Sequence, residues 1–127
     1  MNGFLLVALG GALGASLRHG AGLLAVRHLP LSWPWATTFV NITGSLLMGL
    51  LAGWLATRDA GLSQNTKLFL ATGLLGGFTT FSAFSLEMAN FLRAGEMARA
   101  AAYAGVSVII CVAALFAGLW LARRLFA

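Results

Sequence analysis

The stretch 72–88 combines small, hydroxyl-bearing and aromatic residues in an order that suits an ion site. It reads TGLLGGFTTFSAFSLEM, so that glycines and threonines interrupt an apolar segment, which then continues to Glu87. A helix broken at membrane depth must be sheltered by protein or line a wet cavity, because lipid satisfies no backbone hydrogen bonds. We therefore expect a broken transmembrane helix built around an ion site.

The glycines of this stretch, Gly73, Gly76 and Gly77, have two interpretations. Glycines are frequent in membrane helices, where they allow close helix packing. Alternatively, they form an unwound turn together with Thr79 and Thr80, with free carbonyl groups facing inward. Carbonyl oxygens suit a hard cation such as Na⁺, and two copies of the turn on a two-fold axis would supply about four of them.

Phenylalanines recur every three residues at Phe78, Phe81 and Phe84, roughly along one helix face. Such a stripe can simply face lipid or the core. However, aromatic rings carry a positive edge, which can face an anion without the trapping strength of an ammonium group. The hydroxyl groups that could donate hydrogen bonds to the same anion belong to Thr80, Ser82 and Ser85.

Two other apolar segments carry polar groups. Asn41 could donate two hydrogen bonds to an anion, or it could join two helices. Tyr103, Ser107 and Cys111 follow one another every four residues and share a helix face. That face could line a pathway or serve for packing.

Arg18 and Glu87 are the two charged residues placed well inside apolar segments. Ionisable groups at such positions are expensive and suggest function. Arg18 could attract anions at a vestibule, pair with Glu87, or bind helix-end carbonyl groups, whereas Glu87 could also reach water. His19 and His28 have no acidic or thiol residue near them, so we assign them no metal.

The composition indicates what positions these residues. Of the 127 residues, 60% are hydrophobic and only 9% are charged, and the mean hydropathy is +0.90. A helical span needs about 20 residues, so four spans nearly exhaust the chain. We predict an all-α integral membrane protein that forms a single membrane domain over 1–127. Its predicted helices cover about 4–26, 33–57, 67–92 with a break near 76–80, and 100–122.

The basic residues are balanced between the two ends of the predicted spans. One side carries Arg58, Lys67, Arg123 and Arg124, and the other carries Arg27, Arg93, Arg99 and, if its side chain extends that way, Arg18. Orientation follows the bias in Lys and Arg, and here there is almost none. We therefore expect dual topology and an antiparallel homodimer. The scattered charges of this basic chain suit contact with lipid and form no stripe for nucleic acid.

Enzyme signatures are absent from the sequence, which has no phosphate-binding glycine loop, paired carboxylates or nucleophile–base pair. One alternative is a small multidrug-type antiporter that exchanges cations for protons. Such a transporter needs a carboxylate in the first span, and no acidic residue precedes Asp59. A second alternative is a structural membrane subunit whose glycines and phenylalanines only pack.

The run Gly76–Ser85 followed by Glu87 resembles the signature of the Fluc (CrcB-type) fluoride channels. Further resemblance comes from Val40-Asn41, from 14–18 and from Tyr103-Ala104-Gly105. The resemblance covers the whole chain. It implies an inverted homodimer with two pores, a Na⁺ ion buried at its centre, and passive export of fluoride across the bacterial inner membrane.

The resemblance also implies roles for individual residues. The backbone carbonyls of Gly76 and Thr79 would bind the Na⁺, and Arg18 would lie near a vestibule. The residues on the fluoride pathway would be Phe81, Phe84 and Asn41, with Ser82, Thr80, Tyr103 and Ser107 on its polar side. Cys111 departs from the family pattern, in which a hydroxyl residue can occur, and is not assigned to the pathway.

Overall fold

The computed structural model describes residues 2–57 and 64–127, and within these ranges it contains helices and no strand. Four helical segments are long and apolar enough to cross a membrane: Gly3–His28, Trp35–Thr57, Gln64–Arg93 and Met97–Phe126. This confirms the predicted all-helical chain with four candidate spans. The first two segments are the helices α1 and α2.

The third and fourth segments are each divided into shorter elements. The third consists of α3 (Gln64–Lys67), the π-helix η1 (Leu68–Leu75), α4 (Gly76–Phe78) and α5 (Phe81–Arg93). The fourth consists of α6 (Met97–Gly105), the π-helix η2 (Val106–Ile110) and α7 (Cys111–Phe126). Between α5 and α6 the chain turns at Gly95, whose positive φ of 74° suits glycine.

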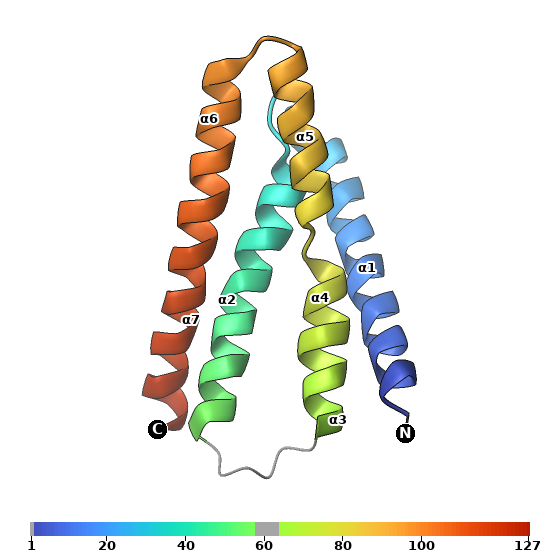
Figure 1. Ribbon diagram of the computed structural model, residues 1–127, viewed down its shortest axis with the longest axis vertical. Helices are drawn as coiled ribbons and strands as arrows, with labels where there is room; N and C mark the ends of the chain where they lie inside the picture. Colours follow the sequence, from blue (N-terminus) through green and yellow to red (C-terminus); the bar gives the residue numbers. More distant parts are fainter. Residues whose placement is uncertain (1, 58–63) are drawn as a thin grey trace.

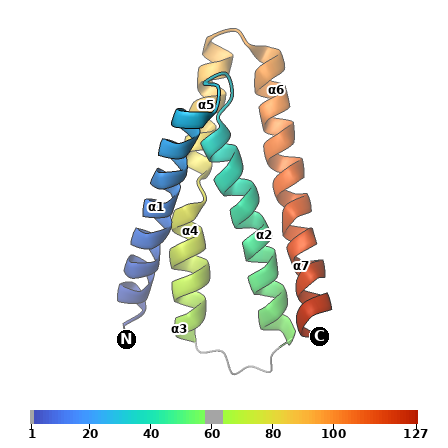
Figure 2. The same cartoon turned by 180° about the vertical axis from the view of Figure 1, so that it is seen from behind.

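The helices form two pairs that diverge toward the end where both termini lie (Figure 1). One pair is α1 with η1 and α4, and the other is α2 with α7 (Figures 1 and 2). The pairs converge at the opposite end, where α5 and α6 meet (Figure 2). The third span thus follows α1 in its first half and approaches the fourth span in its second half.

Small residues bring the helices of each pair into close contact. A Cβ atom at Gly14 of α1 would overlap with the carbonyl oxygen of Leu74, and one at Gly77 of α4 would lie 2.6 Å from the Gly11 carbonyl oxygen. In the second pair, a Cβ atom at Gly49 would overlap with the Leu115 carbonyl oxygen. Backbones that approach this closely are typical of glycine-mediated packing in membranes.

The helical course of the third span stops at Thr79 and Thr80. Both residues are extended, with φ −84°, ψ 161° at Thr79 and φ −154°, ψ 121° at Thr80. The Thr80 hydroxyl then begins α5 by accepting a hydrogen bond from the Ala83 N–H at 3.2 Å. Gly73, Gly76 and Gly77 are helical, so of their two interpretations the unwound turn does not apply to these glycines, and Gly73 and Gly77 make close backbone contacts with α1.

The largest fully buried side chains, Tyr103 and Val40, lie toward the converging end of the bundle. Tyr103 is fully buried, and its ring lies 5.0 Å from that of Phe84 and 5.4 Å, edge to face, from that of Trp33. Val40 of α2 is also almost completely buried. This core fixes α2, α5 and α6 around the point where the third span is interrupted.

Candidate ion pathway

Asn41 of α2 binds both backbone groups of Thr80. Its Oδ1 accepts a hydrogen bond from the Thr80 N–H at 2.8 Å, and its Nδ2 donates one to the Thr80 carbonyl at 2.9 Å. The amide side chain thus replaces the bond that the Thr80 N–H would make in a continuous helix and adds a second bond to the Thr80 carbonyl. Asn41 therefore joins two helices, as one of its two interpretations predicted, and it does so at the interruption itself.

These hydrogen bonds change which carbonyl groups near the interruption keep their usual helical donors. In a continuous helix, the Thr80 N–H would donate to Gly76 and the Ala83 N–H to Thr79. Here they donate to Asn41 and to the Thr80 hydroxyl instead. The carbonyls of Gly76 and Thr79 lose these two donors, and those of Gly77 and Phe78 likewise lack theirs, because the interruption lies between them and the N–H groups of Phe81 and Ser82.

The carbonyl of Gly77 has a different partner. It accepts a hydrogen bond from the Nε of Arg18 at 3.1 Å, across 59 positions of sequence. Arg18 is half-buried in α1, opposite the end of α4. Of the three interpretations of Arg18, the contact with a helix-end carbonyl is the one that the geometry shows.

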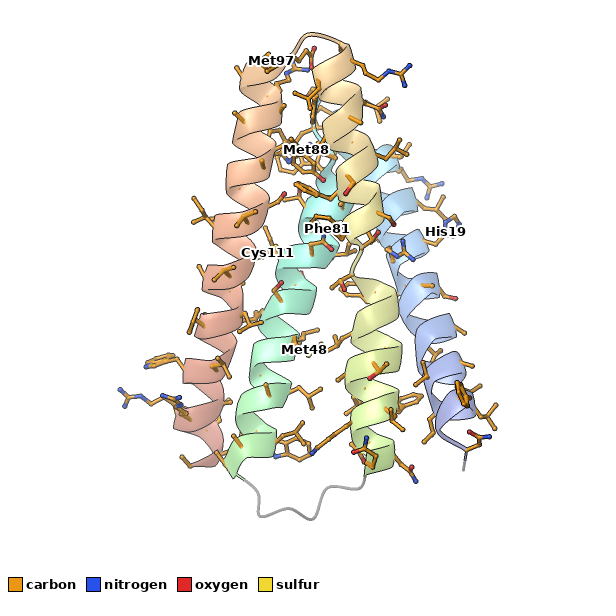
Figure 3. All side chains as sticks on the ribbon, viewed as in Figure 1. His19, Met48, Phe81, Met88, Met97 and Cys111 are labelled. Atoms are coloured by element: carbon orange, nitrogen blue, oxygen red, sulfur yellow. The ribbon has the colours of Figure 1, made fainter. Side chains whose placement is uncertain are left out.

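A cavity of about 420 Å³ lies beside the interruption, between α2, the start of α5 and the fourth span. Residues predicted for an anion pathway that line this cavity are Asn41, Thr80, Phe81, Phe84 and Ser107. Cys111 lines it as well, and the labelled side chains of Phe81 and Cys111 come from the third and fourth spans (Figure 3). No charged side chain of the described residues takes part in the lining.

The two phenylalanines of the cavity differ in their surroundings. Their ring centroids are 5.4 Å apart with an interplanar angle of 41°. Phe84 is only 9% exposed, because Tyr103 packs against it, whereas Phe81 is 78% exposed. One ring therefore belongs to the core of this chain, and the other extends from its surface.

Glu87 lies one helical turn beyond the cavity and is bound by two hydroxyl groups. Its Oε1 accepts a hydrogen bond from Thr37 at 2.7 Å, and its Oε2 accepts one from Tyr103. The carboxylate also lines a second cavity of about 360 Å³ near the Trp33–Trp35 turn. Arg18 and Glu87 do not pair, since the salt bridge within the described ranges joins Arg99 to Glu96.

Comparison with known proteins assigns this architecture to a family. A model described as "CrcB-like protein, Camphor Resistance (CrcB)" matches residues 5–119. A protein of Hyphomonas neptunium named "Fluoride-specific ion channel FluC" is 74% identical over 127 residues, which is the full length of both chains. Proteins of the same name from Caulobacter sp. strain K31 and Phenylobacterium zucineum are each 51% identical, over 99% and 100% of this chain and 98% and 100% of their own.

The chain belongs to the CrcB-like family. This confirms the family resemblance found in the sequence. Together with the four apolar helices, it also identifies a multi-pass membrane protein. The CrcB-like relatives are named as ion channels, in agreement with the expectation that the chain is not an enzyme.

Two of the predicted pathway residues lie outside the cavity lining of this CrcB-like chain. The Ser82 hydroxyl is exposed and lies 3.3 Å from that of Thr80. Tyr103 lies behind Phe84, where it hydrogen-bonds Glu87. Ser82 is therefore on the exposed surface beside Thr80, and Tyr103 belongs to the group around Glu87.

Sequence reasoning did not assign a role to Thr37. Thr37 is one of the two hydroxyl donors to Glu87, and the Trp33 Nε1 donates to the Thr38 hydroxyl at 3.0 Å. A signal for Thr37 was available, because a carboxylate inside an apolar segment needs donors and Thr37 begins the polar half of the second span. The pairing itself depends on how α2 and α5 cross.

Proposed function

We propose that this protein is a passive, fluoride-selective ion channel that exports fluoride from the cytoplasm of a bacterial cell and so relieves its toxicity. The proposal rests chiefly on relatives of matching length that are named as fluoride-specific channels. It places the protein in the inner membrane. The cavity beside the interruption supports it, because weak donors and no charged groups of the described residues line that cavity.

The cavity supplies the kind of contacts that a dehydrated fluoride ion requires. Conduction needs binding that is strong enough for entry and weak enough for release. An amide carries two N–H groups, and Asn41 uses one of them on the Thr80 carbonyl. We assign the second to fluoride, together with the hydroxyls of Thr80 and Ser107 and the ring edges of Phe81 and Phe84. Ser82 and Tyr103 would extend this polar side, with Arg18 near the vestibule and Glu87 as a supporting charge.

An antiparallel homodimer would complete the pathway. Phe81 lines the cavity yet is 78% exposed, so a single chain leaves this side of the pathway uncovered. The balance of basic residues between the two ends is compatible with insertion in both orientations. We infer that a second, inverted copy covers Phe81 and that each dimer has two pores.

A structural Na⁺ at the centre of this dimer fits the donor groups of the chain. The carbonyls of Gly76 and Thr79 have lost their usual helical donors to Asn41 and to the Thr80 hydroxyl. Two carbonyls from each copy would form an all-oxygen site around a hard cation. Such a cation would join the two copies and raise the electrostatic potential for an anion nearby. We thus propose that the interruption of the third span serves both the cation and the anion.

Fluoride efflux from liposomes tests this function. Purified protein would be reconstituted into liposomes loaded with potassium fluoride, and a fluoride electrode would follow release after addition of valinomycin. Parallel liposomes loaded with potassium chloride measure selectivity. We expect rapid fluoride release without matching chloride release. Reconstituted dimer that releases no fluoride would refute the channel and favour a structural subunit.

A further inference from the structure

We propose that Arg18 is a positioning residue, which acts through its Nε on the Gly77 carbonyl and thereby keeps this carbonyl out of the cation site formed by Gly76 and Thr79. This inference rests on the proposed function, since it concerns the cation site between two copies of the chain. It differs from a vestibule role, in which the guanidinium charge attracts anions from water. The two roles depend on different atoms of the same side chain.

The packing of α1 against α4 determines what Arg18 can reach. Gly14 lies one helical turn before Arg18, and a Cβ atom there would lie 2.8 Å from the Phe78 nitrogen. Gly77 in turn approaches Gly11 so closely that an added Cβ atom would be 2.6 Å from its carbonyl oxygen. These contacts fix the register of the two backbones, and one turn further along α1 the Arg18 Nε meets the Gly77 carbonyl at 3.1 Å.

The hydrogen bond to Arg18 distinguishes the Gly77 carbonyl from the neighbouring carbonyls at the interruption. Gly77 is adjacent to Gly76, and its usual helical donor would be the N–H of Phe81, which lies beyond the extended pair. Without Arg18, the Gly77 carbonyl would be a further oxygen able to turn toward a cation. With the bond in place, the peptide plane after Gly77 is held toward α1.

Substitutions of Arg18 by side chains of matched length distinguish the effect of the hydrogen bond from the effect of the charge. The Nε2 of glutamine is as many bonds from Cα as the Nε of arginine, so Arg18→Gln keeps a donor at this position and removes the charge. Arg18→Met has the same reach with neither donor nor charge. Arg18→Lys keeps the charge but has a methylene group where Nε was. Arg27→Met, at the exposed end of α1, controls for loss of a basic residue from this helix.

The experiment measures Na⁺ binding by its effect on stability, because a ligand of the folded state raises the unfolding temperature. The unfolding midpoint of each purified dimer would be followed while NaCl replaces choline chloride at constant ionic strength. We expect wild type, Arg18→Gln and Arg27→Met to respond at similar Na⁺ concentrations. Arg18→Met and Arg18→Lys should need about tenfold more Na⁺ or lose the response. Fluoride efflux should fall for the same two variants.

Other patterns would overturn the inference. If Arg18→Lys behaves as wild type and Arg18→Gln does not, the charge matters and the positioning role is wrong. If Arg18→Met retains the wild-type response, Arg18 does not shape the cation site, while the channel proposal stands. If the unfolding midpoint of the wild-type dimer does not respond to Na⁺, the cation site and this inference are both wrong, whatever the fluoride efflux. Should Arg18→Met fail to fold, the comparison of Arg18→Gln with Arg18→Lys decides.

Discussion

Asn41 and Thr80 form two hydrogen bonds of opposite direction, 2.8 and 2.9 Å long, between one side-chain amide and one residue's backbone. This arrangement resembles a residue pair in an antiparallel sheet, in which the N–H of each residue donates to the C=O of the other. It satisfies an extended residue that has no strand beside it. The interruption of the third span therefore depends directly on a side chain of α2.

We expect Asn41→Leu to destabilise the protein, because the Thr80 N–H loses its partner and the Thr80 carbonyl keeps only its bond within α5. Leaving a buried polar group unsatisfied costs about 1–3 kcal/mol. The unfolding midpoint in detergent should fall by several degrees, and fluoride efflux should be lost. Asn90→Leu is the matched control, since Asn90 is exposed on α5 and its side chain should tolerate the change. Equal midpoints for the two variants would contradict the role of Asn41.

We expect Phe84→Ile to reduce fluoride efflux at least tenfold, because an aliphatic side chain offers no positive ring edge to an anion. Phe84 lines the cavity and is buried, so gel filtration must show that the variant still folds as the wild type does. Phe116→Ile provides the matched control on α7, where the ring is 65% exposed. Wild-type flux from Phe84→Ile would show that this ring does not contact the ion.

Gly49→Ala should separate α2 from α7. The added Cβ atom would overlap with the Leu115 carbonyl oxygen, and backbone atoms cannot move aside as a flexible side chain can. Overpacking of this kind typically costs about 1–3 kcal/mol, which a thermal unfolding assay would detect. In Gly22→Ala the new methyl group meets no described atom within 4 Å. That control should match or exceed wild-type stability, because alanine favours helix more than glycine does.

Glu87 and Tyr103 should be energetically coupled. The carboxylate accepts hydrogen bonds from Tyr103 and Thr37, so removing one partner leaves the others less well satisfied. We expect a double-mutant cycle of Glu87→Gln and Tyr103→Phe to give a coupling of about 0.5–3 kcal/mol. A cycle of Glu87→Gln with Phe116→Ile should be additive. Additivity in both cycles would show that the Tyr103 hydrogen bond contributes little.

The number and type of spans could be predicted from the sequence, because apolar length and low charge are properties of each segment alone. The position of the interruption was predicted only approximately. Glycines are compatible with both helix and unwound chain, and here Gly76 and Gly77 stay helical while Thr79 and Thr80 become extended. What distinguishes the threonines is the partner that Thr80 finds on another helix.

The contacts of the site could not be predicted for the same reason. Arg18 meets a carbonyl 59 residues away, and Glu87 meets Thr37 across 50. Sequence reasoning could state that both charges needed partners, since unpaired charges inside an apolar segment are costly. The choice among partners depends on the register of the helices, and for Arg18 the close contacts of Gly14 and Gly77 determine it.

The partners of the interruption also bear on when it can form during membrane insertion. Its backbone groups are satisfied by Arg18 of α1 and Asn41 of α2, both of which are synthesised before the third span. A third span entering the bilayer without these partners would be most stable as an uninterrupted helix. We therefore expect the extended pair to form late, when this span docks between the two earlier ones. Biogenesis, rather than local sequence preference, would then create the site.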